Sequence, residues 1–379
     1  MKATRHFVWF DTGSRAAVAT LALLGLLLLP ALARADVTYR LEPIAADLDV
    51  PWGMVQLPNG DLVITERDGR LLRLTDGGAG ARSEIDGVPE VDDGGQGGLL
   101  DIALHPDFAE NRWIYLSYSR PGRGGSQTAV GRGRLQGNAL VEWEDVFAPD
   151  QRSRGGRHFG SRIAFDEAGY LFVTVGDRGD RDRNPQDLGR VAGKVHRVHD
   201  DGRIPADNPF VDQGDALPSI WSWGHRNPQG MVIDADTGAV VLHEHGPRGG
   251  DELNRVERGA NYGWPLATFG INYYGTSITP HTALDGMVSP LMHWTPSIAP
   301  SGLAQVADPA LPELQGDLLV GSLKFAEIHR VTLDATRSRV LNSEVLLDTP
   351  GRVRNLYAGR NGELFVAVTG SGLYRLVAN

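Results

Sequence analysis

The chain has 379 residues, no cysteine and a formal net charge of −10 at pH 7. The lack of cysteine excludes disulfides, cysteine-ligated zinc and thiol catalysis, so the hydrophobic core must stabilise the fold by itself. The acidic balance argues against nucleic acid or an anionic membrane as a partner, so any local cluster of basic residues needs a specific explanation.

The first 35 residues have the features of a secretory signal. Three basic residues precede an apolar run at 16–29, and small residues follow at Ala33 and Ala35. We expect cleavage after Ala35, because the apolar run is short for a membrane span. The mature chain, 36–379, is expected to be a single domain in the periplasm or outside the cell, with no membrane insertion once the signal is removed.

A short hairpin pattern recurs six times along the mature chain. In its clearest copies, 59–74 and 361–376, a turn with Gly leads to a run of β-branched and apolar residues, a second turn and another such run. Turn residues and short apolar strands in this order are typical of β-hairpins. Weaker copies begin at Asn111, Gly169, Gly238 and Gly316.

Six hairpins predict an all-β fold, a six-bladed β-propeller of four-stranded antiparallel blades. An early strand at 38–44 is expected to complete the last blade and remove free edges. A β-sandwich is the rival fold, but the inner strands are buried runs rather than clean alternations. Long inserts rich in Gly and Arg, at 152–157 and 177–194, are expected to carry function, as loops on a rigid scaffold usually do.

Three later segments combine residue types that suit a binding site. Residues 221–230 concentrate aromatic, cationic and amide side chains, whereas 245–252 and 261–265 combine Gly and Pro with acids or Asn. Backbone carbonyls freed by Gly and Pro, together with carboxylate oxygens, form the ligand set that calcium prefers. Acidic Gly-rich loops are also often plain solvated turns, and the residues alone leave both interpretations open.

Four motifs in order resemble the soluble glucose and aldose sugar dehydrogenases that depend on pyrroloquinoline quinone (PQQ). They are Pro-Trp-Gly at 51–53, Gly-Gly-Leu-Leu-Asp at 97–101, Gly-His-Arg-Asn-Pro-Gln-Gly at 224–230 and Asn-Tyr-Gly-Trp-Pro at 261–265. One such string is a weak signal, whereas four in register over nearly the whole mature chain are a strong one. The chain length and the segment 268–273 are more similar to the aldose sugar dehydrogenase branch than to the larger glucose-specific enzymes.

The resemblance implies three catalytic residues. His158 matches the general base that removes the hydroxyl proton at the anomeric carbon of an aldose, a role that neutral imidazole can fill near neutral pH. Asp177 matches the acid that orients this histidine, and Arg226 would lie near the quinone oxygens. The implied reaction transfers hydride from the sugar to PQQ, releases a lactone and passes electrons to an external acceptor.

PQQ carries three carboxylates, so its pocket needs cations and hydrogen-bond donors. The resemblance places Lys324, Arg352 and Arg354 around it, although any one of them could be an ordinary surface charge. Because alternate residues of a strand share a face, Arg352 and Arg354 are expected to point together into a central channel. Further implied cofactor contacts are Gln96, Arg226, Asn227 and Tyr273.

Two calcium ions are also implied. The catalytic ion would be held by the backbone carbonyls of Gly246 and Pro247 together with the cofactor, and would polarise the quinone carbonyl. A second, structural ion would be held by the Glu252 carboxylate and the Tyr262 carbonyl. Gly249 and its neighbour Gly250 depart from the family pattern and loosen this loop.

Two other functions suit such a propeller. A calcium-dependent lactonase would not need the cationic cluster, and a non-catalytic sugar-binding propeller would have lost that cluster or His158. A histidine-ligated metal site is set aside, because neither close pair of histidines has a third ligand at convincing spacing. These pairs are His196 with His199 and His243 with His245.

Overall fold

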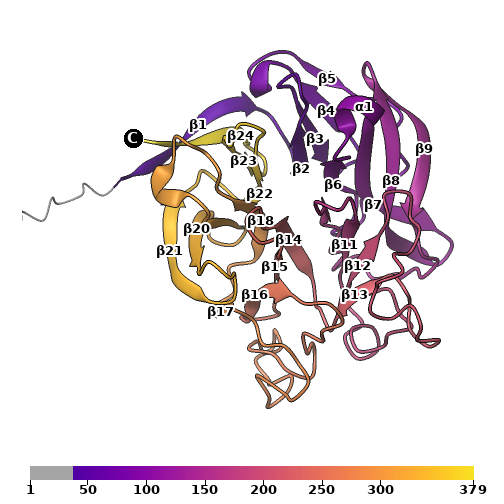
Figure 1. Cartoon of the computed structure of the whole chain (residues 1–379). Helices are drawn as coiled ribbons and strands as arrows, with labels where there is room; N and C mark the ends of the chain where they lie inside the picture. The colour runs from indigo at the N-terminus through magenta and orange to yellow at the C-terminus, as the bar shows by residue number, and fades with distance from the viewer. Residues whose placement is uncertain (1–36) are drawn as a thin grey trace, which may run out of the picture. The chain divides into compact units, whose positions relative to one another are not determined.

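The computed structural model describes Val37–Asn379, and the signal peptide predicted at 1–35 lies outside the described residues. Within Val37–Asn379 the strands form six four-stranded antiparallel sheets arranged around a common centre (Figure 1). The described helical segments are short: α1 (Phe108–Asn111), η1 (Asp76–Gly78) and η2 (Pro312–Leu314). No helix in this part of the chain is long and apolar enough to cross a bilayer.

Five of the sheets, or blades, each use four strands that follow one another in the chain. The first blade contains β2 (Pro51–Gln56), β3 (Leu62–Glu66), β4 (Leu71–Leu74) and β5 (Arg82–Glu84). The second contains β6 (Leu99–Leu104), β7 (Trp113–Gly122), β8 (Gly125–Gln136) and β9 (Ala139–Phe147). The third contains β10 (Ile163–Phe165), β11 (Leu171–Val175), β12 (Lys194–Val198) and β13 (Ile220–Trp223).

The fourth blade contains β14 (Pro228–Ile233), β15 (Val240–Glu244), β16 (Asp251–Val256) and β17 (Met292–Trp294). The fifth contains β18 (Pro300–Gln305), β19 (Leu318–Ser322), β20 (Glu327–Leu333) and β21 (Val340–Asp348). The hairpin copies found in the sequence lie on the second strand of each blade, with the third strand following in the clearest copies.

The sixth blade joins the two ends of the described chain. It contains β22 (Val353–Ala358), β23 (Leu364–Val368), β24 (Gly372–Ala378) and β1 (Tyr39–Ala46). β1 pairs antiparallel with β24, so that Tyr39 lies opposite Ala378 and Ala46 opposite Gly372. The prediction of a six-bladed propeller closed by its earliest strand is therefore confirmed.

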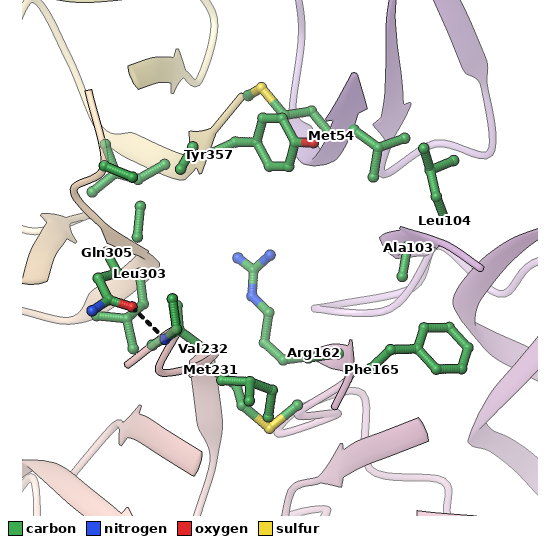
Figure 2. A pocket seen from close by; sticks show the side chains of 18 of the residues that line it. Met54, Ala103, Leu104, Arg162, Phe165, Met231, Val232, Leu303, Gln305 and Tyr357 are labelled. Atoms are coloured by element: carbon green, nitrogen blue, oxygen red, sulfur yellow. Dashed lines mark hydrogen bonds between the residues drawn. The ribbon is translucent and has the colours of Figure 1, made fainter. Parts of the chain in front are cut away.

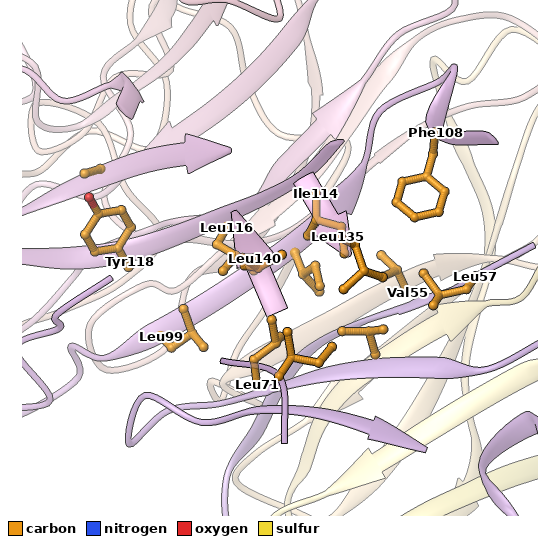
Figure 3. Packing of buried hydrophobic residues seen from close by; sticks show 14 residues of the cluster. Val55, Leu57, Leu71, Leu99, Phe108, Ile114, Leu116, Tyr118, Leu135 and Leu140 are labelled. Carbon is orange, nitrogen blue, oxygen red and sulfur yellow. The ribbon is translucent and has the colours of Figure 1, made fainter. Parts of the chain in front are cut away.

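The centre is lined by the first strand of each of the first five blades and by β22 of the sixth blade. Each of these strands contacts the next around the ring, in the order β2, β6, β10, β14, β18, β22 and back to β2. Apolar side chains fill the space between neighbouring blades. Figure 3 shows the largest cluster, in which Val55 and Leu71 of the first blade pack with Leu99, Ile114 and Leu116 of the second. This burial holds the blades together without disulfides.

Five of the six central strands have a register shift near their first residues. The shifts fall at 51–53, 99–102, 228–230, 300–303 and 353–355. A β-bulge of this kind re-aims side chains and often lies beside a functional site. All five lie at the end where the chain enters the central strand, which is also where the predicted site residues cluster.

Candidate active site

The predicted catalytic residues lie on loops that lead into neighbouring central strands. His158 precedes β10, whereas Arg226 and Asn227 precede β14. Asp177 follows β11 directly and begins the insert before β12. The structure brings these loops together at one end of the central channel.

His158 and Asp177 form a hydrogen-bonded pair. The His158 Nδ1 atom lies 2.6 Å from Asp177 Oδ1, and the Gly179 N–H also donates to that oxygen at 2.7 Å. The other carboxylate oxygen, Oδ2, accepts a hydrogen bond from the Trp264 indole at 2.8 Å. The His158 Nε2 atom makes no hydrogen bond within Val37–Asn379, so it is available to accept a proton from a substrate.

The surroundings favour the neutral form of His158 and the ionised form of Asp177. Burial lowers the pKa of His158, and the charges of Arg226 and Arg157 lower it further, against the opposing effect of Asp177. Burial would raise the pKa of Asp177, but its bond to His158 and the charge of Arg226 hold it below its usual value. A neutral imidazole oriented by a carboxylate is the arrangement of a general base.

Arg226 connects this pair to the loop after β15. Its carbonyl accepts a hydrogen bond from the Asp177 N–H at 2.8 Å. Its guanidinium Nη1 donates to the carbonyls of His245 and Gly246, both at 2.8 Å. Asn227 lies beside it and accepts a bond from the Gly160 N–H at 3.2 Å. Gln96 completes the group, because its Oε1 accepts the His158 N–H at 2.7 Å.

A pocket of about 910 Å3 opens next to this group. Its walls include four predicted binding residues, Gly246, Pro247, Tyr273 and Lys324. Tyr273 is 70% exposed, and Lys324 Nζ donates to the Ser297 carbonyl at 3.1 Å. The loop is tightly folded at Gly246, since a Cβ there would lie 2.2–2.3 Å from the carbonyl oxygens of Gly249 and Gly250. Only glycine fits this close approach of backbone oxygens.

Arg354 lies among other arginines and has no anionic partner between Val37 and Asn379. Burial lowers its pKa to about 9, and the charges of Arg162, Arg352 and Arg67 act in the same direction. Its Nε atom is buried without a hydrogen-bond partner, and Arg354 forms no ion pair with any residue in the described part of the chain. Arg352 is exposed at the same end of the channel. A half-buried cation whose Nε atom is buried without a partner is unfavourable unless an anion binds beside it.

Arg162 closes the channel below this cluster. It pairs with Asp101 at 3.1 Å and lies over the Trp52 ring at 4.1 Å. Beyond it, towards the later residues of the central strands, is a hollow of about 700 Å3 with mostly apolar walls (Figure 2). Figure 2 shows the Arg162 guanidinium projecting into the middle of this hollow. The pocket with the predicted site residues is thus separate from this hollow.

The residues proposed for a structural ion lie near another carboxylate. Burial raises the pKa of Glu252 well above its usual value, and the charge of Glu244 adds to this effect. Glu252 has no cationic partner among the described residues, and the nearby Asn254 Oδ1 is buried without a hydrogen bond. The Tyr262 carbonyl accepts no hydrogen bond in this part of the chain. Within Val37–Asn379, no group of three or more His, Asp or Glu side chains is arranged to hold a metal.

Three contributors were not assigned a role from the sequence. Trp264 lies in the Asn-Tyr-Gly-Trp-Pro motif, and its position there was the available signal for its contact with Asp177. Arg67 lies in the first blade and donates to the Gly95 carbonyl, whereas Arg162 lies in the third. No spacing in the sequence connects these two arginines with Arg354, because only the closed ring brings the blades together.

Comparison with known proteins identifies the family of the chain. The family model described as glucose/sorbosone dehydrogenase matches residues 48–375. The chain belongs to the glucose/sorbosone dehydrogenase family. An aldose sugar dehydrogenase of Escherichia coli is 41% identical over 343 residues, covering 89% of this chain and 91% of that protein. Quinoprotein glucose dehydrogenase B of Acinetobacter calcoaceticus is 27% identical over 409 residues, covering 86% and 84%.

Solved structures of glucose/sorbosone dehydrogenase relatives share the fold. The apo-form of the soluble aldose sugar dehydrogenase from Escherichia coli superposes with a TM-score of 0.85 at 39% identity, covering 90% of this chain and 99% of that one. The PQQ-bound form of an aldose sugar dehydrogenase from Streptomyces coelicolor gives a TM-score of 0.74 at 26% identity, covering 91% and 99%. The resemblance seen in the motifs is therefore confirmed, and the chain is an oxidoreductase of this family.

Proposed function

We propose that the chain is a PQQ- and calcium-dependent aldose sugar dehydrogenase, which oxidises the anomeric carbon of an aldose to the lactone and passes the electrons to an external acceptor. The observation that carries the proposal is Arg354, a cation among other arginines with no anionic partner in the described chain. The signal sequence proposed at 1–35 would deliver the enzyme to the periplasm or the medium.

The residues present suit a flat trianion at the mouth of the channel. Arg352 and Arg354 would pair with carboxylates, and Arg pairs with them strongly where water is scarce. Lys324 adds a positive charge at the neighbouring pocket wall, where Tyr273 offers an exposed ring. Gln96, Arg226 and Asn227 would supply hydrogen-bond donors on the side of His158. A PQQ-bound relative of the same fold supports this choice of cofactor.

The carbonyl oxygens around Gly246 suit a hard cation. A guanidinium already donates to the Gly246 carbonyl, and Pro247 contributes the next carbonyl in the same pocket wall. Backbone oxygens are ligands that calcium prefers. For a structural ion, Glu252 offers a carboxylate and Tyr262 a carbonyl, the first without a cationic partner and the second without a hydrogen bond in the described chain. When bound, PQQ supplies the quinone carbon that receives hydride, and calcium supplies the Lewis acid that polarises it.

The protein's own part in the reaction is proton removal, orientation and charge stabilisation. His158 Nε2 would accept the anomeric hydroxyl proton, because Nδ1 is already committed to Asp177. Asp177 would stabilise the imidazolium that forms, while Trp264 keeps its second oxygen in place. Arg226, oriented by the carbonyls of His245 and Gly246, would favour negative charge that develops next to it.

The two alternatives explain less of the site. A lactonase has no use for an arginine such as Arg354, which has no anionic partner in the described chain, and a sugar-binding propeller has no use for a hydrogen-bonded His158–Asp177 pair. Reconstitution separates the three functions. We expect the purified protein to be inactive alone and to oxidise aldoses with an artificial dye after addition of PQQ and calcium. Lactone hydrolysis with calcium alone, without dye reduction, would contradict the proposal.

The base assignment has its own test. We expect His158→Ala to bind PQQ with affinity close to that of the wild type, because the proposed cofactor contacts lie on other residues. Its kcat for aldose oxidation should fall by about 10²- to 10⁴-fold, the usual contribution of a general base. Cofactor titration followed by steady-state kinetics measures both quantities. Unchanged kcat in this variant would refute the role of His158.

A further inference from the structure

Lysine is rare in this chain, and its positions are informative. Of the 37 basic residues only three are lysines, Lys2, Lys194 and Lys324. Lys324 lies at the proposed cofactor pocket, whereas Lys194 is fully buried at the start of β12. Arginine presents a planar fork of donors, while lysine presents a compact point charge with three donors. Lys194 therefore places a compact charge with three donors inside the fold.

Three backbone carbonyls surround the Lys194 ammonium. Nζ donates to the carbonyls of Asn184 at 2.7 Å, Ala192 at 2.8 Å and Pro185 at 3.1 Å. No carboxylate forms an ion pair with it among the described residues. A neutral amine has two N–H groups and an ammonium has three, so only the protonated form satisfies all three oxygens. The ammonium thus occupies the place that a bound cation would take between these carbonyls.

The carbonyls belong to the loop at 177–193, which begins with Asp177. The Asn184 carbonyl accepts a hydrogen bond from Lys194. The Asn184 side chain, through Nδ2, donates to the Asp177 carbonyl at 2.9 Å. Gln186, two residues further on, donates to the Trp264 carbonyl at 2.8 Å. The Trp264 indole in turn donates to Asp177 Oδ2. Two chains of contacts therefore connect the Lys194 ammonium to Asp177. One reaches the Asp177 backbone carbonyl through Asn184, and the other reaches the Asp177 carboxylate through Gln186 and Trp264.

We propose that Lys194 is a positioning residue, whose ammonium acts as an internal cation that fixes the loop at 177–193 and so aligns Asp177 with His158. The consequence for turnover rests on the proposed function of His158 as the base. A residue that only filled space would be apolar here. Burial lowers the pKa of Lys194 to about 7, so a charge at this position is costly to keep.

Kinetics of Lys194→Met test the proposal in the reconstituted enzyme. Met fills the stem volume but donates to none of the three carbonyls. We expect kcat to fall by about 10- to 100-fold, since small misplacements of catalytic groups have effects of this size. KM and the Kd for PQQ should stay within about threefold of wild type, because the proposed cofactor contacts lie outside this loop. Val195→Ala, a truncation at the next buried position of β12, is the matched control and should keep its kcat.

The titration of His158 in the cofactor-free protein gives a readout that does not depend on activity. NMR of the histidine ring protons, assigned against His158→Ala, measures its pKa in wild type and Lys194→Met. Because Asp177 raises the pKa of His158, loss of alignment should lower it, by about one pH unit. If the substitution only removed the positive charge of Lys194, the pKa of His158 would rise instead. An unchanged or raised value would overturn the proposal, whether or not the protein oxidises sugars.

A second variant covers the case in which Lys194→Met does not fold. Gln186→Leu cuts the route through Trp264, together with the two amide bonds between Gln186 and Asn261, and leaves the ammonium and its three carbonyls in place. We expect the same lowered pKa of His158 and a smaller fall in kcat. A wild-type titration curve for His158 in Gln186→Leu would overturn the side-chain route and with it the proposed alignment.

Discussion

The backbone of His158 has φ +53°, in the left-handed region that non-glycine residues rarely adopt. Its N–H bond to Gln96 and its ring bond to Asp177 compensate for this conformation. Strained backbone of this kind is concentrated at sites where a side chain must face one direction. Here the ring bonds to Asp177 through Nδ1, and Nε2 of His158 has no hydrogen-bond partner among the described residues.

The pH dependence of the reaction should report this environment. Burial lowers the pKa of His158, as do the charges of Arg226 and Arg157. The imidazole therefore stays neutral to a pH below its ordinary pKa of 6.5. Activity therefore rises with pH through a midpoint below 6.5. In Asp177→Asn the carboxylate that raises this pKa is lost, so the midpoint should move to still lower pH while kcat falls by about 10²- to 10⁴-fold.

Profiles of kcat/KM against pH, which report the free enzyme, measure both shifts. His158→Ala is the control, since it should lose the acidic limb altogether. An acidic limb that lies above 6.5 in wild type, or that does not move in Asp177→Asn, would contradict the assignment of this pair.

The strand β22 shows how an element can direct a cation. Its register shifts between Val353 and Asn355, at the position of Arg354. Simple alternation along a strand predicts that Arg352 and Arg354 share a face. However, Arg352 lies before the first residue of β22, and the bulge at Arg354 interrupts the alternation. The structure nevertheless places both charges near each other, since Arg352 contributes to the lowered pKa of Arg354.

Replacing Arg354 should affect the stability of the fold and the binding of PQQ in different ways. The folded-state pKa of Arg354, about 9, lies below its usual 12.5, so its charge destabilises the fold at every pH below about 9. Arg354→Met removes that penalty at pH 7. We expect the Tm of the cofactor-free protein to stay equal or to rise, and the Kd for PQQ to increase by about 10- to 100-fold.

Thermal unfolding and cofactor titration provide the two measurements. Arg352→Met is the matched control, because Arg352 is exposed and its loss should weaken PQQ binding less and leave Tm unchanged. A marked fall in the Tm of cofactor-free Arg354→Met would show that the arginine stabilises the fold, against the interpretation of an anion site.

Some features of the strands could be predicted from their own sequence, and others could not. Turn residues and apolar runs predicted the hairpin strands, such as β3 with β4 and β23 with β24, because that signal is local. The bulges were not predicted, since they depend on how a central strand packs against its neighbours. For the same reason the contact of Trp264 with Asp177, over a separation of 87 residues, had no signature in spacing. The motifs gave the positions of the predicted site residues along the chain, whereas the contacts between these residues depend on the closed ring.

The propeller as a whole depends on a contact between the two ends of the described chain. β1 starts at Tyr39, a few residues after the predicted cleavage site, and supplies the outer strand of the sixth blade. Its side chains Leu41 and Ile44 pack against core clusters of the last and first blades. The same blade carries Arg352 and Arg354, so closure of the ring and the proposed cofactor site are coupled.

Removal of β1 should therefore affect both stability and binding. Deleting residues 37–46 leaves the β24 edge unpaired and exposes apolar side chains, so we expect Tm to fall by several degrees, with weaker PQQ binding. The control is Glu42→Gln, which removes only the exposed ion pairs of Glu42 with Arg40 and Arg375, and such surface pairs contribute little. Thermal unfolding of the three proteins at equal concentration makes the comparison. A deletion variant that unfolds at the wild-type temperature would mean that the remaining strands form a stable ring, and the coupling between closure and the site would then be absent.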